Sequence, residues 1–119
     1  MEKKFEWVIP MKIISEANTH EHWTKSSKRH KMQQFLVRCE FRHHEMKVQL
    51  PCNIKLTRLS ARFLDSDNLQ IAFKWIRDQI ADCILPGLAK GRADDDKRIS
   101  WQYCQEAADS QGIKIEGYW

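Results

Sequence analysis

The segment from Leu69 to Leu85 constrains the fold more strongly than any other part of the chain. Its apolar residues recur at helical spacing, and Pro86-Gly87 follows with residues that end helices. They form one stripe, made of Leu69, Ala72, Phe73, Ile76, Ile80, Cys83 and Ile84. Because a helix with one apolar stripe must bury it against another element, the remaining residues have to supply an apolar surface.

Four segments show the apolar and polar alternation that is typical of strands. Residues 5–14 form the first, and Pro10 within it indicates an edge strand or a bulge. Asn53 to Leu59 alternate with period two, and this second strand can run on to Leu64. Residues 99–103 and 113–119 predict the third and fourth strands.

A second helix is expected from Lys25 to about Met46, a stretch without Gly or Pro for which Thr24 is the expected cap. Basic residues occupy several of its faces, and the expected apolar face consists of Met32, Phe35, Leu36 and Cys39. The element order is β-α-β-α-β-β. It predicts an α+β (α/β) fold, a single domain over residues 1–119 with a mixed sheet and two main helices on one face.

Composition excludes several classes of protein. The chain has 119 residues, 42% of them hydrophobic and 30% charged, which is typical of one globular domain. No run approaches the ~18 apolar residues of a membrane span, and the N-terminus lacks a signal-like apolar block, so we expect a cytoplasmic protein that does not enter a membrane. Wide spacing predicts reduced core thiols for the cysteines, Cys39, Cys52, Cys83 and Cys104.

Charge is distributed unevenly along the chain. Residues 1–62 contain 13 Lys and Arg against six Glu, whereas residues 63–119 contain seven Lys and Arg against ten acidic residues, including all eight Asp. A basic region attracts phosphates, and clustered Asp supplies the hard oxygen ligands that divalent cations prefer. This division indicates a metal-dependent enzyme that acts on a polyanion.

Two acidic groups are candidates for the metal site. Asp65 and Asp67 are two residues apart at the end of the second predicted strand, so in an extended backbone both side chains share one face. Residues 94–96 are all Asp and stand just ahead of the third strand. If that strand lies beside the second, we expect a third carboxylate at the same end of the sheet, where the set would suit Mg²⁺.

A lysine on the predicted helix completes this constellation. Lys74 comes seven residues, or two helical turns, after Asp67, which places both on nearly the same face. Helical side chains lean toward the N-terminus, so the Lys74 ammonium can reach back toward the metal site. Asp78 follows four residues later and can position Lys74.

These residues resemble the RusA-type Holliday-junction resolvases, endodeoxyribonucleases often found in prophages. The likeness rests on Leu64-Asp65-Ser66-Asp67-Asn68-Leu69, then Lys74 with Asp78, then the Asp cluster at 94–96 before a strand. It extends to Ser15-x-x-Asn18 with Trp23 near the N-terminus and to the two C-terminal strands. In the best-known members the lysine directly follows the D-x-D-N-L-x segment, whereas here it lies three residues later.

The resemblance implies a homodimer that nicks four-way DNA junctions symmetrically in recombination and repair, using Mg²⁺, with Mn²⁺ as a substitute, and no small-molecule organic cofactor. The implied catalytic residues are Asp65, Asp67, Lys74 and Asp96, and the implied metal ligands are Asp65, Asp67, Asp94 and Asp96. The acidic run permits two registers, so either Asp94 or one of Asp95 and Asp96 can be the third ligand.

DNA contact is expected from the basic N-terminal region, chiefly through phosphates. The candidate residues are Asn18, Trp23, Lys25, Lys28, Arg29, Lys31, Arg58 and Arg62. Two alternatives stay open. The chain can be a junction-binding protein of the same fold with weak or no turnover, which the displaced Lys74 favours, or a nuclease that acts on other branched DNA.

Overall fold

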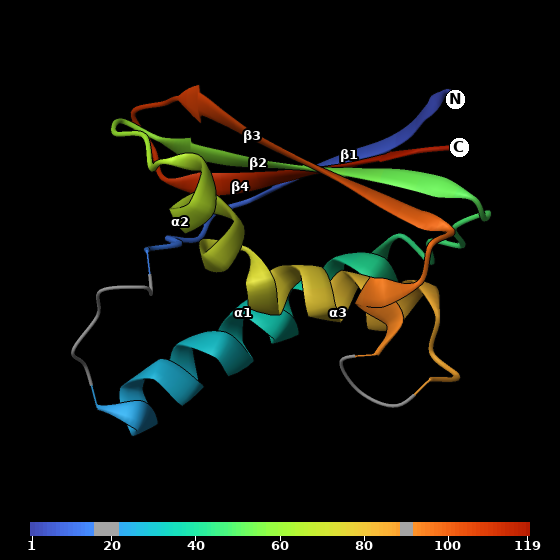
Figure 1. The fold of residues 1–119 in the computed structure, drawn as a ribbon, viewed down its shortest axis with the longest axis horizontal. Helices are drawn as coiled ribbons and strands as arrows, with labels where there is room; N and C mark the ends of the chain where they lie inside the picture. The colour runs from blue at the N-terminus through green and yellow to red at the C-terminus, as the bar shows by residue number, and fades with distance from the viewer. Residues whose placement is uncertain (16–21, 89–91) are drawn as a thin grey trace.

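The structure is a computed structural model that describes residues 1–15, 22–88 and 92–119. Within these residues, four strands form one sheet in the spatial order β1-β4-β2-β3, accompanied by three helices and one 3₁₀ turn (Figure 1). In chain order the elements are β1 (Lys3–Ile9), α1 (Trp23–His43), β2 (Cys52–Ser60), α2 (Ser66–Ala72), α3 (Lys74–Ile84), the 3₁₀ turn η1 (Ala93–Asp95), β3 (Ile99–Ala107) and β4 (Gly112–Tyr118).

The sheet is mixed, as the sequence predicts. β4 lies in its interior and pairs antiparallel with both β1 and β2, whereas β3 pairs parallel with β2 at the outer edge. The connection from β2 to β3 passes through α2 and α3, in agreement with the need of parallel strands for a long crossover. The helices lie on one side of the sheet (Figure 1), so the predicted α+β class is confirmed.

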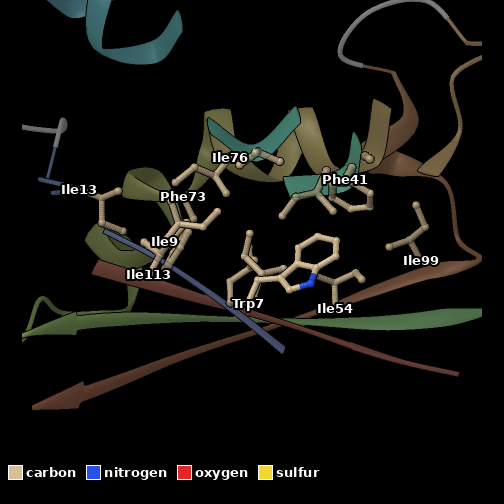
Figure 2. Packing of buried hydrophobic residues seen from close by; sticks show 14 of the residues in the cluster. Trp7, Ile9, Ile13, Phe41, Ile54, Phe73, Ile76, Ile99 and Ile113 are labelled. Carbon is tan, nitrogen blue, oxygen red and sulfur yellow. The ribbon is translucent and has the colours of Figure 1, made fainter. Parts of the chain in front are cut away.

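The core lies between the sheet and the helices (Figure 2). β1 turns Phe5, Trp7 and Ile9 toward the helices by simple alternation, and the Trp7 ring meets Phe41 of α1 edge-on at 4.9 Å. Gly117 of β4 leaves room for the Phe5 ring, because a Cβ there would lie 2.2 Å from the Phe5 Cε1 atom. The stripe predicted for residues 69–85 faces this core, with Phe73, Ile76 and Ile80 fully buried.

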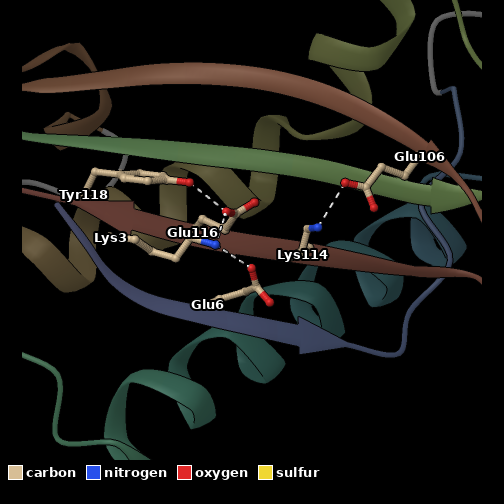
Figure 3. Close-up of polar contacts among 6 residues, drawn as sticks. All are labelled: Lys3, Glu6, Glu106, Lys114, Glu116 and Tyr118. Atoms are coloured by element: carbon tan, nitrogen blue, oxygen red, sulfur yellow. Dashed lines mark hydrogen bonds and ion pairs between the residues drawn. The ribbon is translucent and has the colours of Figure 1, made fainter. Parts of the chain in front are cut away.

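The other face of the sheet carries polar side chains (Figure 3). Lys3 forms ion pairs with Glu6 at 2.9 Å and Glu116 at 3.0 Å, and the Tyr118 hydroxyl donates to Glu116 at 2.7 Å. Burial raises the pKa of Glu116, but the bonds from Tyr118 and Lys3 outweigh burial and hold that pKa below its usual value. This charged carboxylate is therefore paired across neighbouring strands rather than left in an apolar setting.

Element boundaries differ from the predictions in several places. β1 ends at Ile9, directly before Pro10, because proline cannot donate a ladder hydrogen bond. β2 ends at Ser60 rather than Leu64, and the Leu64 backbone instead bonds the Gln105 side chain, with its N–H donating and its carbonyl accepting. The helix predicted from Leu69 to Leu85 is two helices, separated at Phe73.

The orientation of α1 also differs from the prediction. The helix spans Trp23–His43, and its N-cap is His22, whose Nδ1 accepts from the Thr24 N–H, instead of Thr24. Val37 and Phe41 are buried together with the polar Gln33 and Gln34, whereas three of the four residues of the expected apolar face, Met32, Phe35 and Cys39, are exposed. The prediction of that face was wrong, because packing against α3 selects a different side of the helix.

The remaining class-level predictions have simple outcomes. All four cysteines are free thiols, but only Cys52 is fully buried and Cys39 is exposed, so the expectation of four core thiols holds only in part. In the part of the chain that the structure describes, no helix combines the length and apolar character needed to cross a bilayer.

Candidate active site

The first acidic group caps a helix. Asp65 is the N-cap of α2, with extended backbone angles, and its Oδ1 accepts from the Asn68 N–H at 2.9 Å. Asp67 lies in the first turn, where a negative charge is favourable to the helix dipole. Both residues are exposed. The D-x-D-N sequence therefore forms a capped helix start at the end of the connection that leaves β2.

The second acidic group lies at the other end of the sheet. β3 runs parallel to β2, and its first residue, Ile99, is opposite Cys52, the first residue of β2. Residues 94–96 precede β3, whereas Asp65 and Asp67 follow the end of β2. Adjacent strands alone thus do not bring the two groups together. The expectation that a third carboxylate would reach the same end of the sheet was wrong. Residues before β3 lie beside residues after β2 only when the two strands are antiparallel, and here they are parallel.

A cavity on the helical side brings other predicted residues together. It has a volume of about 250 Å³, and it lies where α2, α3, η1 and β3 meet. Its lining consists of Gln70, Ile71, Lys74, Arg77, Asp78, Asp94 and Tyr103. Asp67 stands one turn before Gln70 and Ile71 on α2, so it shares the side of the helix that borders this acidic cavity. A larger hollow of about 670 Å³ beside the chain termini contains none of the predicted site residues.

Asp78 and Asp94 form a carboxylate pair in the acidic cavity. Burial raises the pKa of Asp78 to about 6, the negative charge of Asp94 raises it further, and Lys74 partly opposes both effects. Two carboxyl groups this close favour an added positive charge, which a proton or a cation can provide. Among the acidic residues that line cavities in the described part of the chain, Asp78 has the most strongly raised pKa, and such groups are typical of functional sites.

Arg77 ties the acidic cavity to its surroundings. Its guanidinium donates to the Tyr103 hydroxyl at 2.9 Å and to the Asp94 carbonyl at 3.0 Å, and it lies 4.8 Å from the Trp101 ring centroid. The Arg77 Nε lies 3.7 Å from Asp94 Oδ2 and makes no hydrogen bond, so this ion pair is loose. Arg77 thereby fixes the position of Asp94 relative to α3 and β3.

Lys74 stands at the rim of the acidic cavity. It is the first residue of α3, it is exposed, and its ammonium lies 4.8 Å from the centroid of the neighbouring Trp75 ring. It lies close enough to Asp78 to lower that group's pKa. A cation in this position can stabilise negative charge that develops on a phosphate in the cavity.

Asp95 and Asp96 do not line the acidic cavity. Asp96 accepts three hydrogen bonds from the Arg98 backbone and guanidinium, and these bonds lower the pKa of Asp96 to about 2. Asp95 is exposed. Of the two registers that the acidic run permits, the structure places Asp94 in the cavity.

The expected DNA-contacting residues fall into three groups. Those on α1 lie at its N-terminal half, where Trp23, Lys25, Lys28 and Lys31 are exposed and Arg29 is half-buried. Arg62 is exposed, whereas Arg58 is buried and donates to the backbone carbonyls of Ile13 and Arg62. This placement disfavours a phosphate contact by Arg58. Asn18 lies outside the described residues.

Sequence reasoning missed Arg77 and Tyr103 in the acidic cavity, did not single out Gln70 and Ile71, and underrated Asp78. Asp78 entered only as a partner for Lys74, and Arg77 was not considered, although positions 70, 71, 74, 77 and 78 recur at helical spacing and could have been recognised as one face. Tyr103 left no local signal, because its role depends on how β3 packs against α3.

The donor set fits a hard divalent cation as a two-carboxylate site. Asp78 and Asp94 supply oxygen ligands, the type that Mg²⁺ prefers. Across residues 1–15, 22–88 and 92–119, no three His, Cys, Asp or Glu side chains gather closely enough to hold a metal ion by themselves. Water and substrate phosphate oxygens commonly complete such magnesium sites.

Comparisons with known proteins add no relative. The chain has no significant match to a protein-family model, to a curated protein or to a solved structure. The likeness to the RusA-type resolvases therefore rests on the residues of this chain.

Proposed function

We propose that this chain is a cytoplasmic, Mg²⁺-dependent endodeoxyribonuclease that nicks four-way DNA junctions in recombination and repair, with Mn²⁺ as a substitute. The observation that supports it is the acidic cavity, in which Lys74, Asp78 and Asp94 meet. The sequence leading into the cavity resembles the opening motif of the RusA-type resolvases.

Each residue has a proposed role. A bound divalent cation supplies an activated water and neutralises phosphate charge. Asp78 and Asp94 would hold it, and Asp67 is the nearest further candidate because it faces the acidic cavity's side of α2. Asp65 and Asp96, the other ligands that the resemblance implies, already accept hydrogen bonds from Asn68 and Arg98. Lys74 would stabilise negative charge on the phosphate.

A homodimer is part of the proposal, because two symmetric cuts call for two sites related by a two-fold axis. β3 is an edge strand that pairs only with β2 in the described residues, and Glu106 is the one charged residue in its nine. An edge strand of this length with a single charged residue is open to pairing with another strand. Tyr103 lies at the middle of β3, so antiparallel pairing of two β3 strands would set two acidic cavities on either side of the axis.

A second candidate function is junction binding without turnover. It is favoured by the absence of a three-carboxylate group among the described residues and by the separation of Asp65 from Asp94. The basic surface of α1 would serve such a protein equally well.

The test uses a labelled four-way junction, a matched linear duplex and a replication fork, each with Mg²⁺ or with chelator. Paired nicks confined to the junction and lost on chelation would support the resolvase, whereas cutting confined to the fork would favour a nuclease for other branched DNA. Tight junction binding without cutting in Mg²⁺ or Mn²⁺ would contradict the enzyme and leave the binding protein.

Variants locate the site in the same assay. Asp94→Asn is expected to lower the cleavage rate at least ~100-fold while junction affinity stays within about threefold. Loss of a metal ligand impairs the metal-dependent hydrolysis, whereas the lysines that bind phosphates are unchanged. Asp95→Asn is the matched control, since it neutralises the next residue outside the acidic cavity. Sedimentation equilibrium of the same samples measures whether two copies associate.

A further inference from the structure

A second cavity lies beside the acidic one and has no role in the proposed chemistry. It has a volume of about 390 Å³, in the range of ~300–1,000 Å³ that small-molecule sites occupy. The N-terminal half of α1 supplies Trp23, Ser26, Ser27, His30, Lys31 and Gln34, and α3 supplies Trp75. Two indole rings, an imidazole, two hydroxyls, an amide and a cation thus line this cavity.

Its two tryptophans differ in their environment. Trp75 is half-buried and already stacked, with the His30 ring centroid 4.3 Å from its own at an interplanar angle of 21°. Trp23, in contrast, is 74% exposed, and its ring makes a tilted contact with His22, at a centroid distance of 5.5 Å and an interplanar angle of 34°. Trp75 can therefore form a fixed wall, and Trp23 offers an indole surface on which a planar group can stack.

Charge around this cavity favours a ligand that carries phosphates. Lys25, Lys28 and Lys31 are exposed on the same half of α1. Lys74 connects the two cavities, because it lines the acidic cavity while its ammonium lies over the Trp75 ring. A DNA strand with one phosphate at the acidic cavity would thus pass beside the tryptophan-lined cavity. Aromatic stacking combined with lysines along a backbone is how proteins commonly hold unpaired bases.

We propose that the tryptophan-lined cavity holds one unpaired base of a DNA strand, stacked on Trp23, with Ser26, Ser27 and Gln34 facing its polar edge. The inference rests on the proposed function, in which the chain binds branched DNA, and it adds the recognition of a base released from pairing. Such bases occur where duplex arms meet.

Photo-crosslinking tests the position of the base. The full chain is mixed, in chelator to prevent cutting, with a duplex that contains one unpaired 5-iodouracil, or with the same duplex in which that base is paired. After irradiation, peptide mapping is expected to find the crosslink on Trp23 or Trp75 with the unpaired base and not with the paired one. A crosslink that maps elsewhere overturns the proposal.

Affinity supplies an independent measurement. Trp23→Leu is expected to weaken binding of the bulged duplex about tenfold, the effect of losing one stacked base, and to leave binding of the matched duplex unchanged. Trp23→Phe should recover most of the loss. Phe35→Leu is the control, since Phe35 is an exposed aromatic residue of α1 that does not line this cavity.

The outcomes separate this inference from the proposed function. Equal weakening of both duplexes by Trp23→Leu overturns the inference, and so does dissociation of a dimer by that variant, which would mean that a second copy fills the cavity. If the chain cuts junctions with metal and Trp23→Leu leaves both cutting and binding unchanged, the proposed nuclease is supported and the base site is overturned. A Trp23 crosslink in a chain that cuts no DNA supports the base site and contradicts the nuclease.

Discussion

Two pairs of aspartates have very different surroundings. Asp65 and Asp67 are exposed at the start of α2, where Asp65 caps the helix. Asp78 and Asp94 are partly buried where α3 meets η1, and the pKa of Asp78 rises to about 6. The first pair performs a local backbone task, whereas the second is a product of tertiary packing.

The difference shows what makes a carboxylate chemically special. The spacing of Asp65 and Asp67 predicted a metal site, yet aspartate is also a common N-cap residue, and this is the role that Asp65 has in the structure. Asp78 and Asp94 are 16 residues apart and gain their properties from burial and from one another. A change at the first pair should therefore act on helix stability, and a change at the second on charge balance.

Arg77→Met should have the largest effect on stability, because it removes two hydrogen bonds and the positive charge nearest Asp94. We expect a loss of about 2 kcal/mol in the free energy of unfolding, measured by urea denaturation at pH 7. Arg77→Lys keeps the positive charge but lacks the planar guanidinium, so its free energy of unfolding should lie between those of the wild type and the Met variant. A Met variant as stable as the wild type would show that Arg77 does not support the pair.

Asp65→Ala should cost about 1 kcal/mol in unfolding free energy, the usual effect of losing an N-cap, and Asp65→Ser should restore it. Thermal unfolding followed by circular dichroism measures both. If Asp65 is also a metal ligand, the Ser variant will be stable yet lose cleavage, which would bring the two pairs of aspartates into one site.

Asp78→Asn should stabilise the protein at pH 8. The pKa of Asp78 is raised from 3.8 to about 6 on folding, so the folded state holds this proton more tightly, and stability falls as pH rises through the interval from 4 to 6. Above pH 6 the ionised Asp78 carboxylate lowers the free energy of unfolding by about 1 kcal/mol, after allowance for its partial exposure. Unfolding free energies at pH 4 and pH 8 should show the gain only at the higher pH. A gain at both would contradict a charge effect.

Asp96→Asn should have the smallest effect. The bonds from Arg98 lower the pKa of Asp96 to about 2, so the contribution of this pair is present at neutral pH and disappears as pH falls below 4 toward 2. Because the pair is exposed, only a slight decrease in the urea midpoint is expected at pH 7, and none at pH 2. A large loss at pH 7 would mean that Asp96 has a role beyond its bond to Arg98.

Local patterns predicted the order of elements but not every boundary. Alternation located all four strands, and the stripe from Leu69 to Ile84 located the residues that pack on the sheet. The break at Phe73 has no local signal, because Phe73 has helical backbone angles and is fully buried within that stripe. The face of α1 was mistaken because its apolar residues surround the helix, so packing of Val37 and Phe41 decides it.

The candidate site was predictable only in part for a related reason. Helical spacing relates Lys74 to Asp78 without knowledge of the fold, whereas the predicted common face of Asp67 and Lys74 assumed one helix that in the structure is divided at Phe73. Asp94 and Tyr103 reach the acidic cavity because β3 pairs parallel with β2. The residues of a strand do not indicate whether it pairs parallel or antiparallel with its neighbour. The α3 residues of the acidic cavity could therefore be predicted from the sequence, whereas Asp94 and Tyr103 could be placed only with knowledge of the sheet topology.

The position of β4 has a consequence for how the chain can fold during synthesis. β1 comes first of the four described strands along the chain, yet in the described sheet its only neighbour is β4, which lies more than 100 residues later. Until residues 112–118 emerge, the apolar side chains of β1 have no strand beside them. Truncation before Gly112 would leave β1 separated from the β2–β3 pair, and the unpaired edges and apolar surface of such a fragment would favour aggregation.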